Sequence, residues 1–405
     1  MKNGLVVVLE EQKLWIPSTV PFLVFGLIYY LVTPYFTLLF FGDLPLVKAA
    51  EAYIGLDYFD IFYWLDVSLV LTFFLLGYVA AGIFVREKGV FFDRASNFRL
   101  APSIIFLMLC VFYILIYLKV KAAGGAMFTG YESYNIEVLG PLATLVFTSA
   151  LFYNFFCRKK IRFIFFFLFL ATSLGLLGFG SRMFFILSFI AIALGSLSRN
   201  TFLFRNVFFY VFLGAIFLVV LGVGVWRSGY SFEDSSILVS IFLVEPLFTA
   251  TSGALYLANL GGRYVLNIPV DIAAAFINFI PSFLYPEKML LISKLTFDEN
   301  KESPFGASAL FSNLYSNFGV FYPIYIFFIG YFYGFLRAKS FWSPFFRAVY
   351  FSLLPLLMFH FFREGFITFI KVLIFNGLIF PFLLLSLFYL CFKTNNKDEV
   401  NHASE

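Results

Sequence analysis

The sequence predicts an all-α integral membrane protein, a polytopic bundle of about twelve transmembrane helices. Of its 405 residues, 62% are hydrophobic and only 13% are charged, whereas soluble domains carry about 25% charged residues. Several apolar runs reach the roughly 20 residues that a helix needs to cross a bilayer. These runs are continuous and do not alternate with polar residues, which excludes a transmembrane β-barrel.

The first apolar run has no small-residue cleavage pattern, so it is predicted to be an uncleaved membrane anchor. We expect one transmembrane domain over residues 1–392 and a polar tail over 393–405. The fifth, sixth and ninth runs are short, and Glu245-Pro246 is expected to interrupt the eighth. The predicted spans are 14–41, 61–85, 100–120, 139–157, 162–178, 183–198, 206–226, 235–260, 268–285, 317–336, 343–362 and 366–392.

Several classes of function lack their sequence signatures. The chain has no GxxxxGK[ST] phosphate loop, no Asp-x-Asp pair, and no HExxH or Cys/His cluster. Its net charge of +5 is dispersed among membrane loops, which argues against nucleic-acid binding. We therefore expect a chemistry without metal, cofactor or ATP, performed by carboxylates, arginines and one imidazole.

The distribution of charge predicts the orientation in the membrane. With the N-terminus inside, most of the 28 lysines and arginines lie on the cytoplasmic side, and so does the C-terminal tail. Most acidic residues then fall outside. The longest external loop of the C-terminal half is predicted over 286–316, with a turn at Phe305-Gly306. A loop of this length inside a compact bundle is more often functional than decorative.

Ionisable residues in or at the ends of membrane spans are functional candidates, because each costs about 2.5–3.5 kcal/mol to insert. Arg182 begins the sixth span in Gly180-Ser181-Arg182. Ser181 is predicted to cap that helix, whose free N–H groups and the guanidinium together would form an anion site. Arg227 closes the seventh span beside Trp226, where an interfacial anchor is the ordinary alternative.

The C-terminal half adds a second group of candidates. His360 and Arg363 are three residues apart, so they share a helix face, and Glu364 follows directly. The alternative is a local Arg363–Glu364 pair that only closes the helix. Lys288 follows Pro286 at the start of the external loop, where it is either a phosphate ligand or a solvated charge.

Glu245 lies midway along the eighth run among apolar neighbours, so it needs a partner or a cavity. A structural hydrogen bond between helices is the alternative. Asp66, near the outer end of the second span, is expected to have a structural role. The positive-inside rule disfavours outward cations, so a group of them indicates a phosphate-bearing ligand. The outward cations are Arg182, Arg227, Lys288 and Arg363.

A series of short motifs runs through residues 180–365. In chain order they are Gly180-Ser181-Arg182, Ile280-Pro281, Pro286-Glu287-Lys288, Gly306, Leu314-Tyr315-Ser316-Asn317-Phe318-Gly319, Gly330-Tyr-Phe-Tyr-Gly334 and Arg363-Glu364-Gly365. Their order and the topology resemble the bacterial O-antigen polymerase (Wzy) family. Many members carry a glutamate near the Tyr-x-Asn-Phe-Gly stretch, where this chain has Ser312-Asn313-Leu314.

The resemblance implies a GT-C-like glycosyltransferase of the bacterial inner membrane. Such an enzyme polymerises undecaprenyl-pyrophosphate-linked oligosaccharide repeat units at the periplasmic face, transferring the growing glycan to a new unit as lipid pyrophosphate leaves. A flippase and a chain-length regulator would be its partners. The four outward cations would bind the substrate, and the candidate general bases are Glu364, Glu245 and His360.

Other functions remain open at this point. A lipid-linked oligosaccharide flippase also has about twelve spans, but it is expected to line an internal cavity with charges from several of them. An O-antigen ligase shares the architecture and donor, and differs in using a lipid-A-core acceptor. A membrane acyltransferase would depend on His360 alone.

Overall fold

The computed structural model describes residues 15–84, 101–122, 136–156, 158–179, 181–228, 235–259, 267–280, 284–299 and 301–389. Within these ranges all regular structure is helical, as the sequence predicts. The α-helices in chain order are α1 (Val20–Leu27), α2 (Thr33–Phe41), α3 (Pro45–Glu51), α4 (Ile61–Phe84), α5 (Ala101–Ala122), α6 (Ile136–Phe155), α7 (Lys159–Gly178), α8 (Met183–Arg199), α9 (Val207–Ser228), α10 (Ser235–Asn259), α11 (Val270–Phe279), α12 (Lys288–Leu295), α13 (Leu310–Phe318), α14 (Tyr322–Ser340), α15 (Pro344–Leu353), α16 (His360–Arg363) and α17 (Phe366–Ile370).

Within the described ranges, eight helical stretches are long and apolar enough to cross a membrane. The protein is thus a helical membrane protein. The eight are Val20–Phe41, Ile61–Ile83, Pro102–Ala122, Lys159–Gly178, Val207–Val225, Val239–Asn259, Leu310–Ser340 and Phe366–Tyr389. Shorter apolar helices take the places of the other four predicted spans: Leu139–Phe155, Met183–Arg199, Val270–Phe279 and Pro344–Leu357.

The prediction of a short fifth span was wrong. Lys159–Gly178 is a full-length candidate span, because the helix begins within the basic cluster rather than after it. Long basic side chains allow this, since their stems cover apolar surface while the charged ends reach water. The sixth and ninth predicted spans are short, as expected.

The predicted interruption at Pro246 was also wrong, because α10 continues through it. Proline has no N–H to donate, so the carbonyl of Phe242, four residues earlier, loses its helical partner. The Tyr29 hydroxyl donates to that carbonyl at 2.9 Å. A tyrosine from the first span thereby replaces the missing backbone hydrogen bond, as a membrane helix requires.

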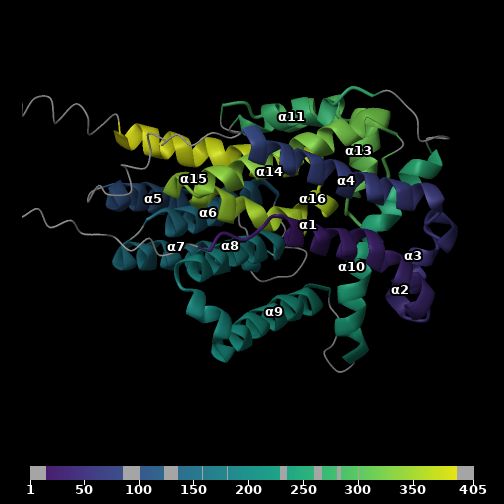
Figure 1. The fold of residues 1–405 in the computed structure, drawn as a ribbon, viewed down its shortest axis with the longest axis horizontal. Coiled ribbons are helices and arrows are strands. Elements are labelled where there is room, and N and C mark those ends of the chain that lie inside the picture. The colour runs from purple at the N-terminus through teal and green to yellow at the C-terminus, as the bar shows by residue number, and fades with distance from the viewer. Residues whose placement is uncertain are drawn as a thin grey trace, which may run out of the picture.

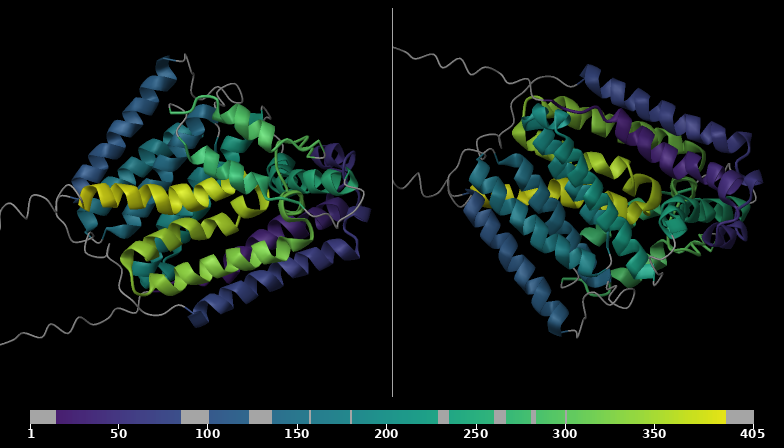
Figure 2. Two further views of the ribbon diagram at one scale, coloured as in Figure 1. Left: turned by 90° about the horizontal axis from the view of Figure 1, so that it is seen from above. Right: turned by 90° about the horizontal axis from the view of Figure 1, so that it is seen from below.

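Helices α4 and α14 lie side by side along the bundle (Figure 2). Glycines bring their backbones into contact: a Cβ at Gly77 would overlap the Phe327 carbonyl oxygen, and one at Gly330 would overlap that of Phe74. Gly330 and Gly334 form the small-xxx-small spacing that permits such close packing in membranes. The Gly330–Gly334 motif therefore has a structural role.

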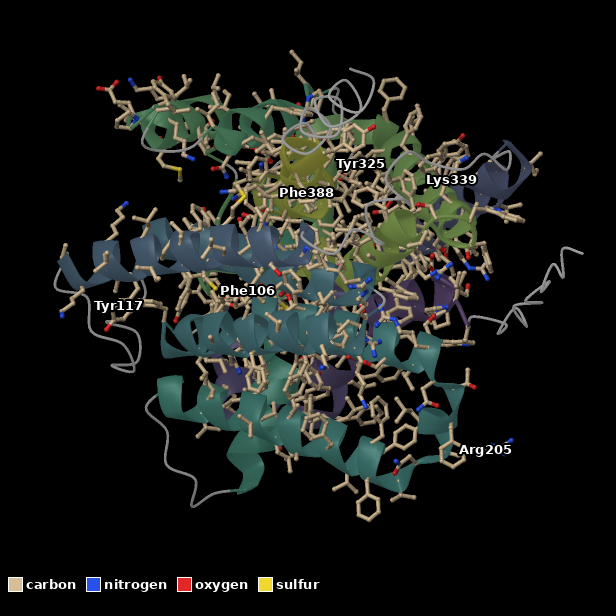
Figure 3. The ribbon with its side chains drawn as sticks, turned by 90° about the vertical axis from the view of Figure 1, so that its left-hand side faces the viewer. Phe106, Tyr117, Arg205, Tyr325, Lys339 and Phe388 are labelled. Atoms are coloured by element: carbon tan, nitrogen blue, oxygen red, sulfur yellow. The ribbon has the colours of Figure 1, made fainter. Side chains whose placement is uncertain are left out.

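Most helices run along the horizontal axis of Figure 1, while α10 stands across them and α9 lies along the lower edge. The described chain begins and ends at the left-hand end of the bundle. Figure 3 looks at that end and labels Arg205 and Lys339.

The predicted loop 286–316 contains α12 and the first turns of α13. Gly306 has a φ of 70°, which supports the predicted turn. Lys301 ties the loop to α11 through an ion pair with Asp271, at 2.8 Å between Nζ and Oδ2. Asn317 donates to the same Asp271 oxygen at 2.8 Å, so this carboxylate joins three segments.

Asp66 has the structural surroundings expected for it. It is buried and accepts hydrogen bonds from the hydroxyls of Tyr315, at 2.7 Å, and Tyr322, at 2.9 Å. These bonds connect α4 to α13 and to the start of α14. Much of the Tyr-x-Asn-Phe-Gly stretch therefore holds helices together, with Tyr315 on Asp66 and Asn317 on Asp271.

Candidate functional site

Arg363 lies between two carboxylates. Its Nε is 2.7 Å from Oε1 of Glu245, and its Nη1 is 3.4 Å from Oε1 of Glu364. Each of the three side chains is about a quarter exposed, at 27% for Arg363, 24% for Glu245 and 29% for Glu364. Glu245 belongs to α10, and Arg363 is the last residue of α16. A carboxylate among apolar neighbours was expected to need a partner, and for Glu245 this partner is Arg363.

Two tyrosines of the first span lie beside these charges. The π-helical segment Ile28–Val32 joins α1 to α2 and carries Tyr29 and Tyr30. The Tyr29 hydroxyl is within electrostatic range of Glu245, Arg363 and Arg182. Wide turns of this kind occur often at functional sites. The candidate site therefore draws on the first span, the start of α8, α10 and α16.

Arg182 is positioned by the corner between α7 and α8. It occupies the residue before α8, and no side chain caps that helix. The prediction that Ser181 is the cap was wrong, because the Ser181 N–H donates to the Leu176 carbonyl at 3.0 Å and closes α7 instead. The Arg182 guanidinium packs against Gly224 of α9, where a Cβ would lie 2.9 Å from Cζ.

The turn that carries Arg363 and Glu364 is held by the segment before and within α13. The Ser308 N–H donates to the Arg363 carbonyl at 3.0 Å, and the Asn313 amide donates to the Glu364 carbonyl at 3.4 Å. Asn313 of α13 thus fixes the backbone at Glu364.

The formal charges of Arg182, Arg363, Glu245 and Glu364 sum to zero. The cluster is therefore not a bare cationic pocket, since it holds two carboxylates, both in contact with Arg363. The contact between Arg363 Nε and Glu245 is the shorter one, at 2.7 Å, but it is an ion pair without hydrogen-bond alignment, whereas Arg363 Nη1 donates a hydrogen bond to Glu364 at 3.4 Å. Since 3.4 Å is long for a hydrogen bond, an arriving anion can compete with Glu364 for Arg363.

His360 lies behind this cluster. It is completely buried, its ring packs against Phe184 with centroids 5.3 Å apart, and within the described structure neither ring nitrogen has a hydrogen-bond partner. A charged imidazolium is disfavoured in such a place. Of the three candidate bases, Glu245 and Glu364 are partly exposed and His360 is not.

The last two substrate-binding candidates are Arg227 and Lys288. Arg227 is in the last turn of α9, and its side chain lies outside the described part of the structure. Lys288 begins α12 and donates to the carbonyls of Ile280, at 2.6 Å, and Asn278, at 3.4 Å. Lys288 lies within electrostatic range of Lys371, a residue that the sequence did not single out.

Within the described residues, no three His, Cys, Asp or Glu side chains come together in a way that could hold a metal ion. Comparison with protein-family models, with curated proteins and with solved structures gives no match.

Proposed function

We propose that the protein is a membrane glycosyltransferase that polymerises undecaprenyl-pyrophosphate-linked oligosaccharide repeat units. In this proposal it acts at the periplasmic face of the bacterial inner membrane, with both termini in the cytoplasm. The observation that carries the proposal is the gathering of Arg182, Arg363 and Glu245 around Tyr29 from distant parts of the chain, with Glu364 paired to Arg363. The motif order across residues 180–365 and the twelve apolar helices support it.

The proposed reaction needs an electrophile with a good leaving group and an activated hydroxyl. Arg182 and Arg363 bind the diphosphate of the growing chain's carrier, since guanidinium groups bind phosphate oxygens bidentately. They stabilise the charge that develops as the bond from the anomeric carbon to phosphate oxygen breaks. No ATP is consumed, because the diphosphate ester supplies the leaving group.

The two glutamates take different parts in this proposal. Glu364, which lies farther from Arg363 at 3.4 Å, accepts the proton of the acceptor hydroxyl as that oxygen bonds to the anomeric carbon. Glu245 keeps Arg363 in place through its 2.7 Å contact. Holding two lipid-linked substrates in one orientation supplies most of the remaining acceleration.

The test uses purified protein in liposomes that contain a single-length undecaprenyl-pyrophosphate repeat unit and neither ATP nor nucleotide sugar. The expected product is a ladder of glycans that differ by one repeat unit. Arg182→Ala is expected to slow ladder formation about 10²–10³-fold, whereas Arg205→Ala, which changes an exposed arginine beyond the opposite end of α8, leaves the rate unchanged. Movement of the repeat unit across the bilayer without joining would show a transporter instead.

A further inference from the structure

Lys371 is a cationic residue inside a candidate membrane span, and it has no part in the proposed catalytic mechanism. It follows α17 directly and opens the π-helical segment Lys371–Ile379, inside the span Phe366–Tyr389. About five residues, or roughly 7 Å of helix, separate it from the turn of Arg363 and Glu364. Charges at such positions mark ligand or ion sites by default, and π-helical turns also concentrate there.

Two ammonium groups converge on one residue at this place. Lys371 Nζ lies 3.5 Å from Oδ1 of Asn278, and Lys288 Nζ lies 3.4 Å from the backbone oxygen of the same Asn278. Lys288 is only 6% exposed. Gly140 of α6 adjoins Lys371, since a Cβ there would lie in ordinary contact with Nζ, at 3.5 Å. Four segments of the chain thus surround the two lysines.

The charge of this lysine pair is not balanced by the described protein. Neither ammonium has a carboxylate within ion-pair distance in the described ranges, and the two lie within electrostatic range of each other. Burial lowers the pKa of the Lys288 ammonium from its ordinary value. Two like charges held together at partly buried positions are unfavourable unless an anion joins them. A dianion is the ligand that would balance both.

The surroundings of the pair favour an anion attached to a hydrocarbon chain. Next to Lys288 on α12, Met289 is 53% and Leu290 is 54% exposed, and Phe276 of α11 is 51% exposed. Exposed apolar side chains gathered beside a charged site are suited to contact the hydrocarbon chain of a ligand. A ligand with a phosphate head and an apolar tail would satisfy the lysines and these surfaces together.

We propose that Lys288 and Lys371, converging on Asn278, form a second anion site that binds the phosphate group of a lipid. The site shares no residue with the Arg182–Arg363 cluster, and we infer that the protein holds two phosphate-bearing ligands at once. The identification of this lipid as a second carrier-linked repeat unit rests on the proposed function; the anion site itself does not.

The test counts bound lipid by native mass spectrometry of the full chain in detergent, with undecaprenyl pyrophosphate as the probe. Wild-type protein is expected to bind two molecules. The double variant Lys288→Met/Lys371→Met is expected to bind one, with affinity for the second at least about tenfold weaker. Lys294→Met, an exposed lysine on the same helix α12, is the matched control and should bind two.

Competing ligands, added to protein that holds undecaprenyl pyrophosphate, show which part of the lipid the lysine site recognises. If inorganic pyrophosphate displaces the second lipid, the head group alone is recognised; if phosphatidylglycerol does so equally well, the ligand is a bulk phospholipid. Methionine is apolar and similar in length, so ligand-free double variant should melt at a higher temperature than wild type. A double variant that binds two lipids as tightly as wild type, or that only loses stability, would overturn the site.

Because binding is counted directly, this result does not depend on polymer formation. If lipid binding depends on the lysines but the protein makes no ladder, the anion site is supported and the glycosyltransferase proposal is contradicted. If the double variant makes a ladder at the wild-type rate and binds lipid as wild type does, the glycosyltransferase proposal stands and the anion site is contradicted.

Discussion

Arg363→Ala is expected to reduce polymer formation about 10²–10³-fold, because a group that stabilises charge at the leaving oxygen acts mainly in the transition state. The substitution also leaves Glu245 and Glu364 without their shared partner. Both carboxylates are about a quarter exposed, so they can hydrate, and the protein should still insert and fold. The measurement is the rate of ladder formation by purified protein in liposomes.

Two further variants show whether Arg363 acts through its charge alone or through the shape of its guanidinium group, and provide a control. Arg363→Lys keeps the positive charge but loses the planar fork, so its rate should fall between those of wild type and alanine. Lys48→Ala removes an exposed ion pair with Asp43, at 3.6 Å, and should change nothing. Normal chain lengths from Arg363→Ala would remove Arg363 from the proposed mechanism.

Gly224→Ala is the second substitution with a large expected effect. The added methyl group would occupy the position of the Arg182 guanidinium, so the flexible arginine must turn away. A displacement of about 1 Å in a catalytic group lowers rates about 10²-fold. Since only the far end of a long side chain moves, the melting temperature should stay close to that of wild type.

The matched control for this variant is Gly214→Ala on the same helix α9. A Cβ at Gly214 meets nothing within 4 Å, so both its activity and its stability should equal those of wild type. Equal rates for the two alanine variants would show that the contact between Arg182 and Gly224 has no part in activity.

The sequence predicted the membrane helices well because their length and composition report the lipid solvent directly. Helix ends were less predictable. Pro246 was expected to break α10, but Tyr29, more than two hundred residues earlier, donates to the carbonyl that proline leaves free. Ser181 was expected to cap α8, but its N–H closes the preceding helix. Both outcomes depend on neighbours that a local pattern does not contain.

The candidate site was predictable in part. Intramembrane charge singled out Glu245 and Arg363, and the structure pairs them. The same signal was present at Lys371 and at Asp271, which lie within predicted spans and were overlooked. Tyr29 carries no such signal, because a tyrosine in a membrane span is ordinary until a partner is known. His360 was a candidate because the chain has only two histidines, but its complete burial could not be predicted from the sequence.

The central claim is that Arg182 and Arg363 act on one ligand. A double-mutant cycle of Arg182→Ala, Arg363→Ala and the combined variant, read as ladder formation in liposomes, tests it most directly. Residues that act as a unit are strongly non-additive, so the combined variant should be little slower than either single variant. Free-energy losses that simply add would place the two arginines in independent sites and contradict the account.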